Sequence, residues 1–146
     1  MRQFAHNDFV IGCPDGWMDI STVILAGQPQ GDFTPNITIT RDRLRSPQPA
    51  AQYAADTLPA LKKEFQGLGY ELRQEGPISL GELIGYQRFH TFRLQGSGLQ
   101  IQQWQVYAVN GSEAVTITCT DKLANFQNSF QRFQEAVRQF AFKPPG

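Results

Sequence analysis

Residues 121–142 carry a stripe of apolar side chains, four of them phenylalanine, that requires a large partner surface. The members of the stripe recur at steps of three and four, which is the period of one face of an α-helix. They are Leu123, Phe126, Phe130, Phe133, Val137 and Phe140. At about 1.5 Å per residue this helix would span roughly 30 Å, about the width of a small domain. We therefore expect the helix to lie across a sheet as part of the core.

The composition limits the possible functions. A chain of 146 residues suits one domain, spanning 1–146, with a real core. Thirteen basic and thirteen acidic residues cancel, so the charge that a nucleic-acid-binding protein needs is missing. No apolar run precedes Asp8, and no later run is long enough to cross a bilayer. These features predict a cytosolic protein that does not insert into membranes.

Cysteines and histidines form no metal-binding pattern. Cys13 and Cys119 both lie in strand-like apolar surroundings, and we expect free thiols there, with a disulfide between them as the open alternative. Two cysteines and two histidines, none close together in sequence, give no zinc spacing. The sequence also lacks a phosphate-binding loop, a dinucleotide-binding turn and a nucleophile elbow. We predict no cofactor and no metal.

The candidate catalytic residues do not converge. If the last three strands form a meander, His90 and Cys119 lie two strand spacings apart, roughly 9–10 Å, which exceeds hydrogen-bond reach. His6 belongs to a terminus that we expect to be loose, and a mobile base is a poor one. Asp19 and Asp42 are expected to end strands. We therefore predict that the protein is not an enzyme.

Periodicity and turn signals predict an α+β fold. Two prolines and two glycines between residues 27 and 35 indicate a loop, and Ser46 with Pro47 should begin the first helix. The expected strands are 8–13, 20–26, 36–42, 70–74, 83–94, 99–109 and 113–120, and the expected helices are 46–66 and 121–142. The order β-β-β-α-β-β-β-β-α predicts an antiparallel sheet with two helices packed on it.

A hairpin at 110–111 allows the register of two strands to be worked out. Asn-Gly favours a type I′ turn, in which both residues have positive φ. With Val109 opposite Ser112, Trp104 faces Ile117. One face of this hairpin is then apolar and should receive the phenylalanine helix, since side chains alternate across a sheet. That face carries Trp104, Val106, Ala108, Val115, Ile117 and Cys119.

The opposite face of the hairpin is polar without being charged. It carries Gln103, Gln105, Tyr107, Thr116 and Thr118. One interpretation is a solvated side of a two-layer domain. The other is a binding surface, because amide and hydroxyl groups beside an apolar neighbour such as Ile24 can recognise a partner. A purely solvent-facing sheet would more often carry lysine and glutamate. We predict that function resides on this uncovered face.

Several short motifs, in collinear order, resemble the DcrB-related proteins. The segment 14–19, Pro-Asp-Gly-Trp-Met-Asp, looks like the opening P-x-x-W-x-D of that family. The segment 36–42 resembles its third strand, and 85–86, 105–107 and 115–120 resemble later strands. The closing helix at 130–142 is similar as well. The resemblance implies a PsbP-like α/β sandwich, in which a curved antiparallel sheet is flanked by helices.

The absence of an amino-terminal signal makes the chain more similar to the cytosolic branch of this family, the effector-associated (Eag) chaperones of type VI secretion. The resemblance implies a homodimer whose sheet face is a groove for an apolar, transmembrane-type segment of a secreted effector. Ile24 and Gln105 match groove residues, and Thr22 stands where a larger aliphatic residue is expected. The partner-binding residues implied are Thr22, Ile24, Gln103, Gln105, Tyr107, Thr116 and Thr118.

Two other functions stay open. A structural accessory subunit of a membrane or photosynthetic complex is the first, as PsbP-like proteins are. A role in binding Ran-type GTPases, known elsewhere in this fold, is the second. Likeness of fold does not separate these functions from a chaperone.

Overall fold

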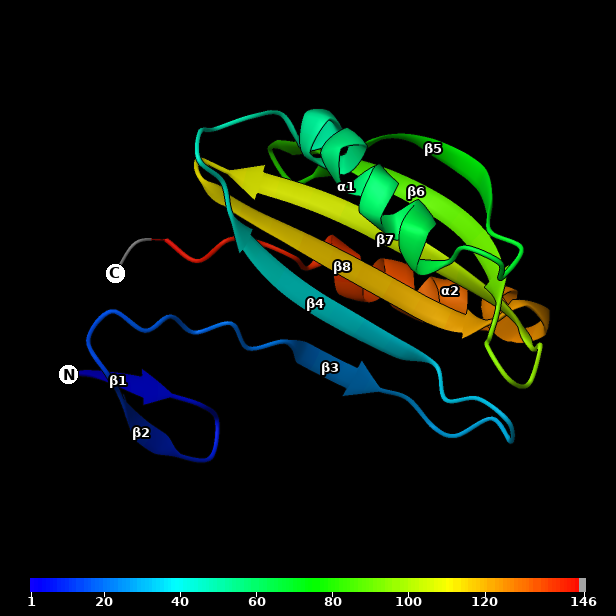
Figure 1. Ribbon diagram of the computed structural model, residues 1–146, viewed down its shortest axis with the longest axis horizontal. Coiled ribbons are helices and arrows are strands. Elements are labelled where there is room, and N and C mark those ends of the chain that lie inside the picture. The colour runs from blue at the N-terminus through cyan, green and yellow to red at the C-terminus, as the bar shows by residue number, and fades with distance from the viewer. Residues whose placement is uncertain (145–146) are drawn as a thin grey trace.

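The computed structural model describes residues 1–144 and contains eight strands and two helices in that range (Figure 1). The elements are β1 (Arg2–Ala5), β2 (Val10–Cys13), β3 (Val23–Ala26), β4 (Asn36–Arg43), α1 (Ala50–Glu64), β5 (Glu71–Leu80), β6 (Leu83–Arg93), β7 (Gln100–Asn110), β8 (Glu113–Lys122) and α2 (Leu123–Arg138). The predicted order is confirmed, with β1 as one additional strand.

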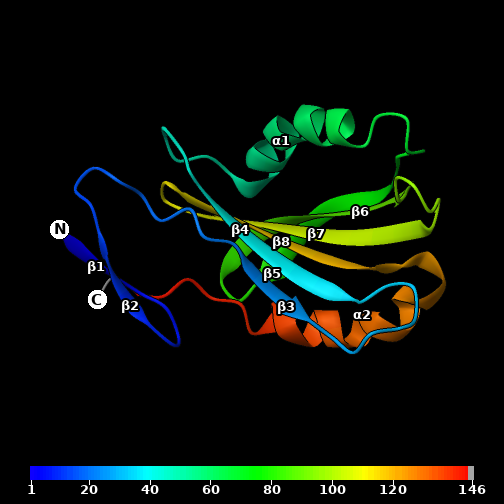
Figure 2. The same ribbon diagram turned by 60° about the horizontal axis from the view of Figure 1, so that its bottom comes forward.

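Six strands form one antiparallel sheet in the order β3-β4-β8-β7-β6-β5. Strands β5 to β8 make a meander, while β4 pairs with β8 across a long stretch of sequence. Helix α2 lies on one face of this sheet and α1 on the other (Figure 2). The predicted α+β class, with an antiparallel sheet flanked by two helices, is confirmed.

The phenylalanine stripe of α2 packs on the predicted apolar face. Phe126 and Phe133 are buried against the sheet, and the ring of Phe130 meets Trp104 edge to face at 5.1 Å between centroids. All six residues predicted for the apolar face belong to this cluster. Leu123 is the exception in the stripe, since it begins α2 and stays 40 % exposed. Just before it, the buried carboxylate of Asp121 accepts hydrogen bonds from the first turns of the helix.

The predicted register of the β7–β8 hairpin is wrong by two residues. Trp104 pairs with Cys119, not with Ile117, because the turn consists of Gly111 and Ser112. Only Gly111 has a positive φ, +61°, so the turn is not the expected type I′ with two such residues. A shift of two positions leaves every side chain on its predicted face, since the period of a strand is two.

Helix α1 begins later than predicted. Pro49 is its N-cap and Ala50 its first residue, so Ser46 and Pro47 lie outside the helix. The reason is local: helical geometry is disfavoured for a residue that precedes proline, and Pro49 places that restriction on Gln48. At the other end, Gly67 has φ +80° and reverses the chain after the helix.

The amino-terminal arm, residues 1–22, projects beyond the large sheet (Figures 1 and 2). Strand β1, which was not predicted, pairs with β2 to form a separate hairpin. Side chains of the arm that would normally be buried are exposed, among them Trp17 and Ile20. The arm therefore contributes little to the core of the large sheet.

Candidate binding groove

A groove of about 430 Å³ lies between α1 and the face of the sheet formed by β4, β8 and β7. Its floor is defined here as Asn36, Thr38, Thr40, Gln103, Gln105, Thr116, Thr118 and Thr120. Its wall is the inner side of α1, which contributes Leu61, Glu64 and Phe65. Aromatic and aliphatic side chains at one end, including Phe33 and Phe92, close the groove there.

The floor follows from strict alternation along three neighbouring strands. Threonines alternate with apolar residues in the middle of β4 and in β8, so their hydroxyls gather on one face, at Thr38, Thr40, Thr116, Thr118 and Thr120. The register brings Thr38, Thr118 and Gln105 into one row across the sheet. None of the described floor residues carries a charge. The floor can therefore make short-range hydrogen bonds while exerting little long-range attraction.

Apart from the exposed Glu64, the wall is apolar. Phe65 is buried and stacks on Phe92 with 4.0 Å between ring centroids. Leu61 packs against the same cluster, which also contains the fully buried Ile101. An occupant of the groove would touch hydrocarbon on one side and neutral polar groups below. That combination suits an apolar segment with a few polar atoms.

Beneath α1, a buried arginine fastens the helix to the sheet. Arg88 is 2 % exposed and donates to the carbonyl oxygen of Ala54 at 2.7 Å. It also donates to the hydroxyl of Tyr107 at 3.1 Å and pairs with Glu75 at 3.4 Å. A buried cation needs such partners because desolvation strongly penalises an unpaired charge. Arg88 thus sets how closely this part of α1 approaches the sheet.

A second buried polar side chain lies under the other end of the groove. His90 is fully buried, and its Nε2 lies 2.7 Å from Oε1 of Gln103. Burial, with a smaller effect of the nearby Arg88 charge, lowers the pKa of His90, although the contact with Gln103 opposes this. The imidazole is therefore held neutral. Its Nδ1 has no hydrogen-bond partner among the described residues.

Four of the predicted partner-binding residues lie together in the groove floor: Gln103, Gln105, Thr116 and Thr118. Tyr107 does not, because it is 2 % exposed and packs under Tyr53 and Ala54 of α1. The expectation that this face of the sheet is uncovered is wrong. Helix α1 lies on it and converts an open surface into a groove.

The remaining two predicted residues lie outside the groove. Ile24 sits on the edge strand β3, opposite Thr38, and is 65 % exposed. Thr22 immediately precedes that strand and is exposed too. Both belong to the outer margin beside the floor. Whether any of the seven residues binds a partner stays a prediction.

Sequence reasoning missed the contribution of β4 and α1. The alternation around Thr38 and Thr40 was visible and predicted a half-buried strand, yet it did not say that β4 pairs with β8. Leu61 and Phe65 were assigned to the first helix without a position on the sheet. The sequence did contain a signal for the groove floor. Threonines alternate with apolar residues in both β4 and β8, and when these strands pair, the threonines of both lie on the same face.

The candidate catalytic side chains are separated in space. His90 faces the groove side, whereas Cys119 belongs to the apolar cluster under α2. Burial raises the pKa of the Cys119 thiol to about 12, so it is a poor nucleophile. Cys13 and Cys119 are both free thiols. Within residues 1–144, no three potential metal ligands come together.

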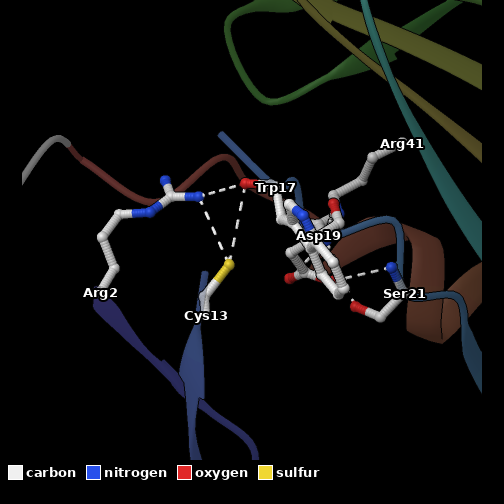
Figure 3. Close-up of polar contacts among 6 residues, drawn as sticks. All are labelled: Arg2, Cys13, Trp17, Asp19, Ser21 and Arg41. Carbon is white, nitrogen blue, oxygen red and sulfur yellow. Dashed lines mark hydrogen bonds and ion pairs between the residues drawn. The ribbon is translucent and has the colours of Figure 1, made fainter. Parts of the chain in front are cut away.

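The segment 14–19 serves as an anchor for the arm (Figure 3). Asp19 accepts a hydrogen bond from the amide of Ser21 at 2.8 Å and pairs with Arg41 of β4 at 2.8 Å. Contacts from Ser21, followed by Arg41, lower the pKa of Asp19 to about 2. In the same region, the Trp17 carbonyl accepts from Arg2 at 2.6 Å. The Asp19–Arg41 pair ties the arm to β4 near the start of β3, and the Arg2–Trp17 contact holds the arm together internally.

In the part of the chain that the structure describes, no helix has the length and apolar character needed to cross a membrane.

Comparisons with known proteins agree with the architecture. The sequence model of the DcrB family matches residues 10–139. Protein PA94 from Pseudomonas aeruginosa is similar in structure, with a TM-score of 0.78 and 20% identity, over 99% of each chain. Cyanobacterial PsbP (CyanoP) from Synechocystis has a TM-score of 0.59 and 11% identity, over 97% of this chain and 92% of its own. At these identities the likeness concerns the fold alone. No curated protein sequence matches the chain.

Proposed function

The chain belongs to the DcrB family, and we propose that it is a non-enzymatic cytosolic chaperone or adaptor. In this proposal it binds an apolar, transmembrane-type segment of a secreted effector in the groove between α1 and the sheet. It then aids loading of that effector into a secretion apparatus such as the type VI system. The bound segment would be shielded from water until export.

The observation that carries the proposal is the chemistry of the groove. Its volume of about 430 Å³ accommodates a row of side chains from a helix. The wall offers Leu61 and Phe65, whereas the floor offers uncharged hydroxyl and amide groups. A transmembrane helix has no charge to recognise, so its carrier needs apolar contacts together with neutral hydrogen-bonding groups. The groove offers apolar side chains and neutral hydrogen-bonding groups next to each other.

The proposal includes a homodimer, supported by an unprotected sheet edge. Edge strands usually carry proline, charge or a bulge that blocks pairing with another chain. Strand β5, at one edge, has Pro77, acidic residues and a register shift after Leu72. Strand β3, at the other, reads Val-Ile-Leu-Ala, and the side chains of Val23, Ile24 and Leu25 are 49 %, 65 % and 53 % exposed. Pairing of β3 between two copies would cover this edge.

A soluble carrier protein fused to an amino-terminal helix of about 20 alternating leucines and alanines provides the test, since that length spans a bilayer. Co-expression with this protein should keep the fusion soluble and yield a complex by gel filtration. Thr40→Trp, which fills the groove from an exposed floor position, should abolish the complex. Gln127→Trp on the outer face of α2 is the matched control. Equal solubility of the fusion without its partner would refute the proposal.

Light scattering tests the dimer. Leu25→Lys on β3 should produce monomers, whereas Leu72→Lys on the opposite edge should leave the dimer intact. A wild-type protein that is monomeric at micromolar concentration contradicts this part of the proposal.

An accessory subunit of a membrane or photosynthetic complex is the alternative, and the PsbP-like fold is the observation that favours it. Such a subunit would fractionate with membranes and leave them at high salt, because its attachment would be electrostatic. It would give no complex with the fusion protein.

A further inference from the structure

The buried side chains of Arg88 and Tyr107 fix the side-chain amide of Gln105 in one orientation through hydrogen bonds. A guanidinium can only donate, so the Tyr107 hydroxyl must accept the bond from Arg88 at 3.1 Å. The single phenolic proton is then available for Gln105, whose Oε1 accepts it. Gln105 therefore keeps its oxygen towards Tyr107 and directs its NH₂ group to Oγ1 of Thr118, at 3.2 Å.

Gln103 is held in the same way by a different side chain. The neutral imidazole of His90 has one ring proton, and only its Nε2 has a partner, Oε1 of Gln103. A proton on Nε2 leaves a lone pair without a partner on Nδ1, which is better tolerated than a buried N–H without an acceptor. Gln103 thus accepts from His90 and donates its NH₂ group to Oγ1 of Thr120 at 3.1 Å.

These two chains of hydrogen bonds have the same polarity. In each, a buried donor satisfies the glutamine oxygen, and the glutamine donates to a threonine of β8. A threonine hydroxyl that accepts a hydrogen bond still has its own proton to give. Within residues 1–144, the hydroxyl protons of Thr118 and Thr120 have no acceptor among the hydrogen bonds of the structure. The floor therefore presents protons to the groove.

We propose that the groove selects oxygen acceptors on its occupant, and that Tyr107 and His90 are positioning residues that create this preference. The inference rests on the proposed function and specifies which chemical groups on the occupant the groove recognises. The matching groups are neutral oxygens, such as serine hydroxyls and the unpaired carbonyls at the carboxyl end of an apolar helix. A carboxylate is disfavoured because, within residues 1–144, no lysine, arginine or histidine lines the groove to offset its desolvation, and Glu64 of the wall would repel it. The preferred occupant is an apolar segment that carries a few such oxygens.

Two peptides of equal shape test the preference. Each is a lysine-flanked helix of about 20 leucine and alanine residues. One carries O-methylserine at its central positions, and the other carries norvaline, which replaces the ether oxygen by a methylene group. The O-methylserine peptide should bind about three- to tenfold more tightly per engaged oxygen, the range of a typical hydrogen bond. Calorimetry or fluorescence anisotropy measures both affinities.

Variants locate the origin of the preference. Thr118→Val removes one of the two hydroxyl protons at nearly constant shape and should lower the ratio of the two affinities, leaving the part that Thr120 contributes, whereas Thr118→Ser should retain the full ratio. Tyr107→Phe frees the Gln105 amide to turn and should also reduce the ratio of affinities, with little effect on the norvaline peptide. The NMR signals of the Gln105 NH₂ group should move in this variant, which a purely structural role of the ring does not require.

The outcomes separate the two proposals. If both peptides bind wild-type protein equally, the acceptor preference is refuted while the groove function stands. If neither binds, the groove function fails, and the preference falls with it. A ratio that is unchanged in Tyr107→Phe but lower in Thr118→Val would refute the positioning role of Tyr107. A lower ratio in both variants, and an unchanged ratio in Thr118→Ser, supports the inference, and a ratio unchanged in Thr118→Val refutes it.

Discussion

On the face of the sheet under α2, alternate residues of β7 and β8 are apolar and interlock with the phenylalanines of the helix. On the face under α1, the same two strands carry glutamine, tyrosine and threonine, joined by directed hydrogen bonds. The apolar face gains stability from area and packing, which have little directional preference. The polar face gains less stability but fixes the orientation of individual groups. A binding site benefits from the second property.

The largest effect is expected on the apolar face. Phe133→Ala leaves a cavity beside Phe126 and should lower the free energy of unfolding by about 3–5 kcal/mol. Urea denaturation measures the change. Phe9→Ala is the control, because this ring is 53 % exposed in the arm and its loss should change stability by less than about 0.5 kcal/mol. Similar losses in the two variants would contradict the assignment of the core to α2.

A smaller loss is expected when the polar face is disrupted. Arg88→Met leaves the Ala54 carbonyl and the Tyr107 hydroxyl without this donor and should destabilise the protein by about 1–3 kcal/mol. Amide hydrogen exchange should increase in α1 more than in α2. Arg132→Met on the exposed side of α2 is the control. If α1 and α2 respond alike, Arg88 does not act specifically on the groove wall.

The polar face should also respond to pH through His90. Burial lowers the pKa of His90, so the unfolded chain binds this proton first as the pH falls below about 6.5. Stability is therefore present above that pH and declines below it, by at most about 1.4 kcal/mol per pH unit. Denaturation at pH 7.5, 6.5 and 5.5 measures the slope. His90→Gln should flatten it and His6→Gln should not; the opposite pattern would assign the effect to the arm.

The smallest effect concerns a carboxylate in solvent, where salt screens the interaction. The pKa of Asp19 is lowered to about 2, so its contacts with Ser21 and Arg41 contribute above pH 3.8 and are lost as the pH falls towards 2. Relaxation of the Trp17 indole N–H should then report a more mobile arm, with little change in global stability. Asp19→Asn should show this mobility already at neutral pH. An arm equally rigid at pH 5 and 2 would contradict the anchoring role.

The two faces of the sheet could be predicted from the sequence because they depend on a period of two. Even the wrong pairing of Trp104 with Ile117 left both side chains on the correct face, since the error was an even number of residues. The α2 stripe was equally clear, because its phenylalanines demand burial. Such patterns are local and need no knowledge of distant pairing.

The groove could not be predicted, because it depends on contacts between distant segments. Nothing in the sequence of α1 says which face of the sheet it covers, and Tyr107 was consequently expected in the open. Arg88 gave no signal either: a single arginine in a strand is ordinarily exposed. Only the fold reveals that it lies under Ala54 and beside Tyr107.

The pairing of β4 with β8 has a consequence for synthesis of the chain. Asn36 pairs with Thr120, so β4 leaves the ribosome well before its partner exists. At about 5–20 residues per second, the delay is on the order of 4–17 s. During this interval the apolar side chains of β3 and β4 have no sheet to join, and nascent chains can associate through them. A lower rate of translation initiation reduces the number of unfinished chains present together without lengthening the delay, and it should therefore increase the yield of folded protein independently of its final stability.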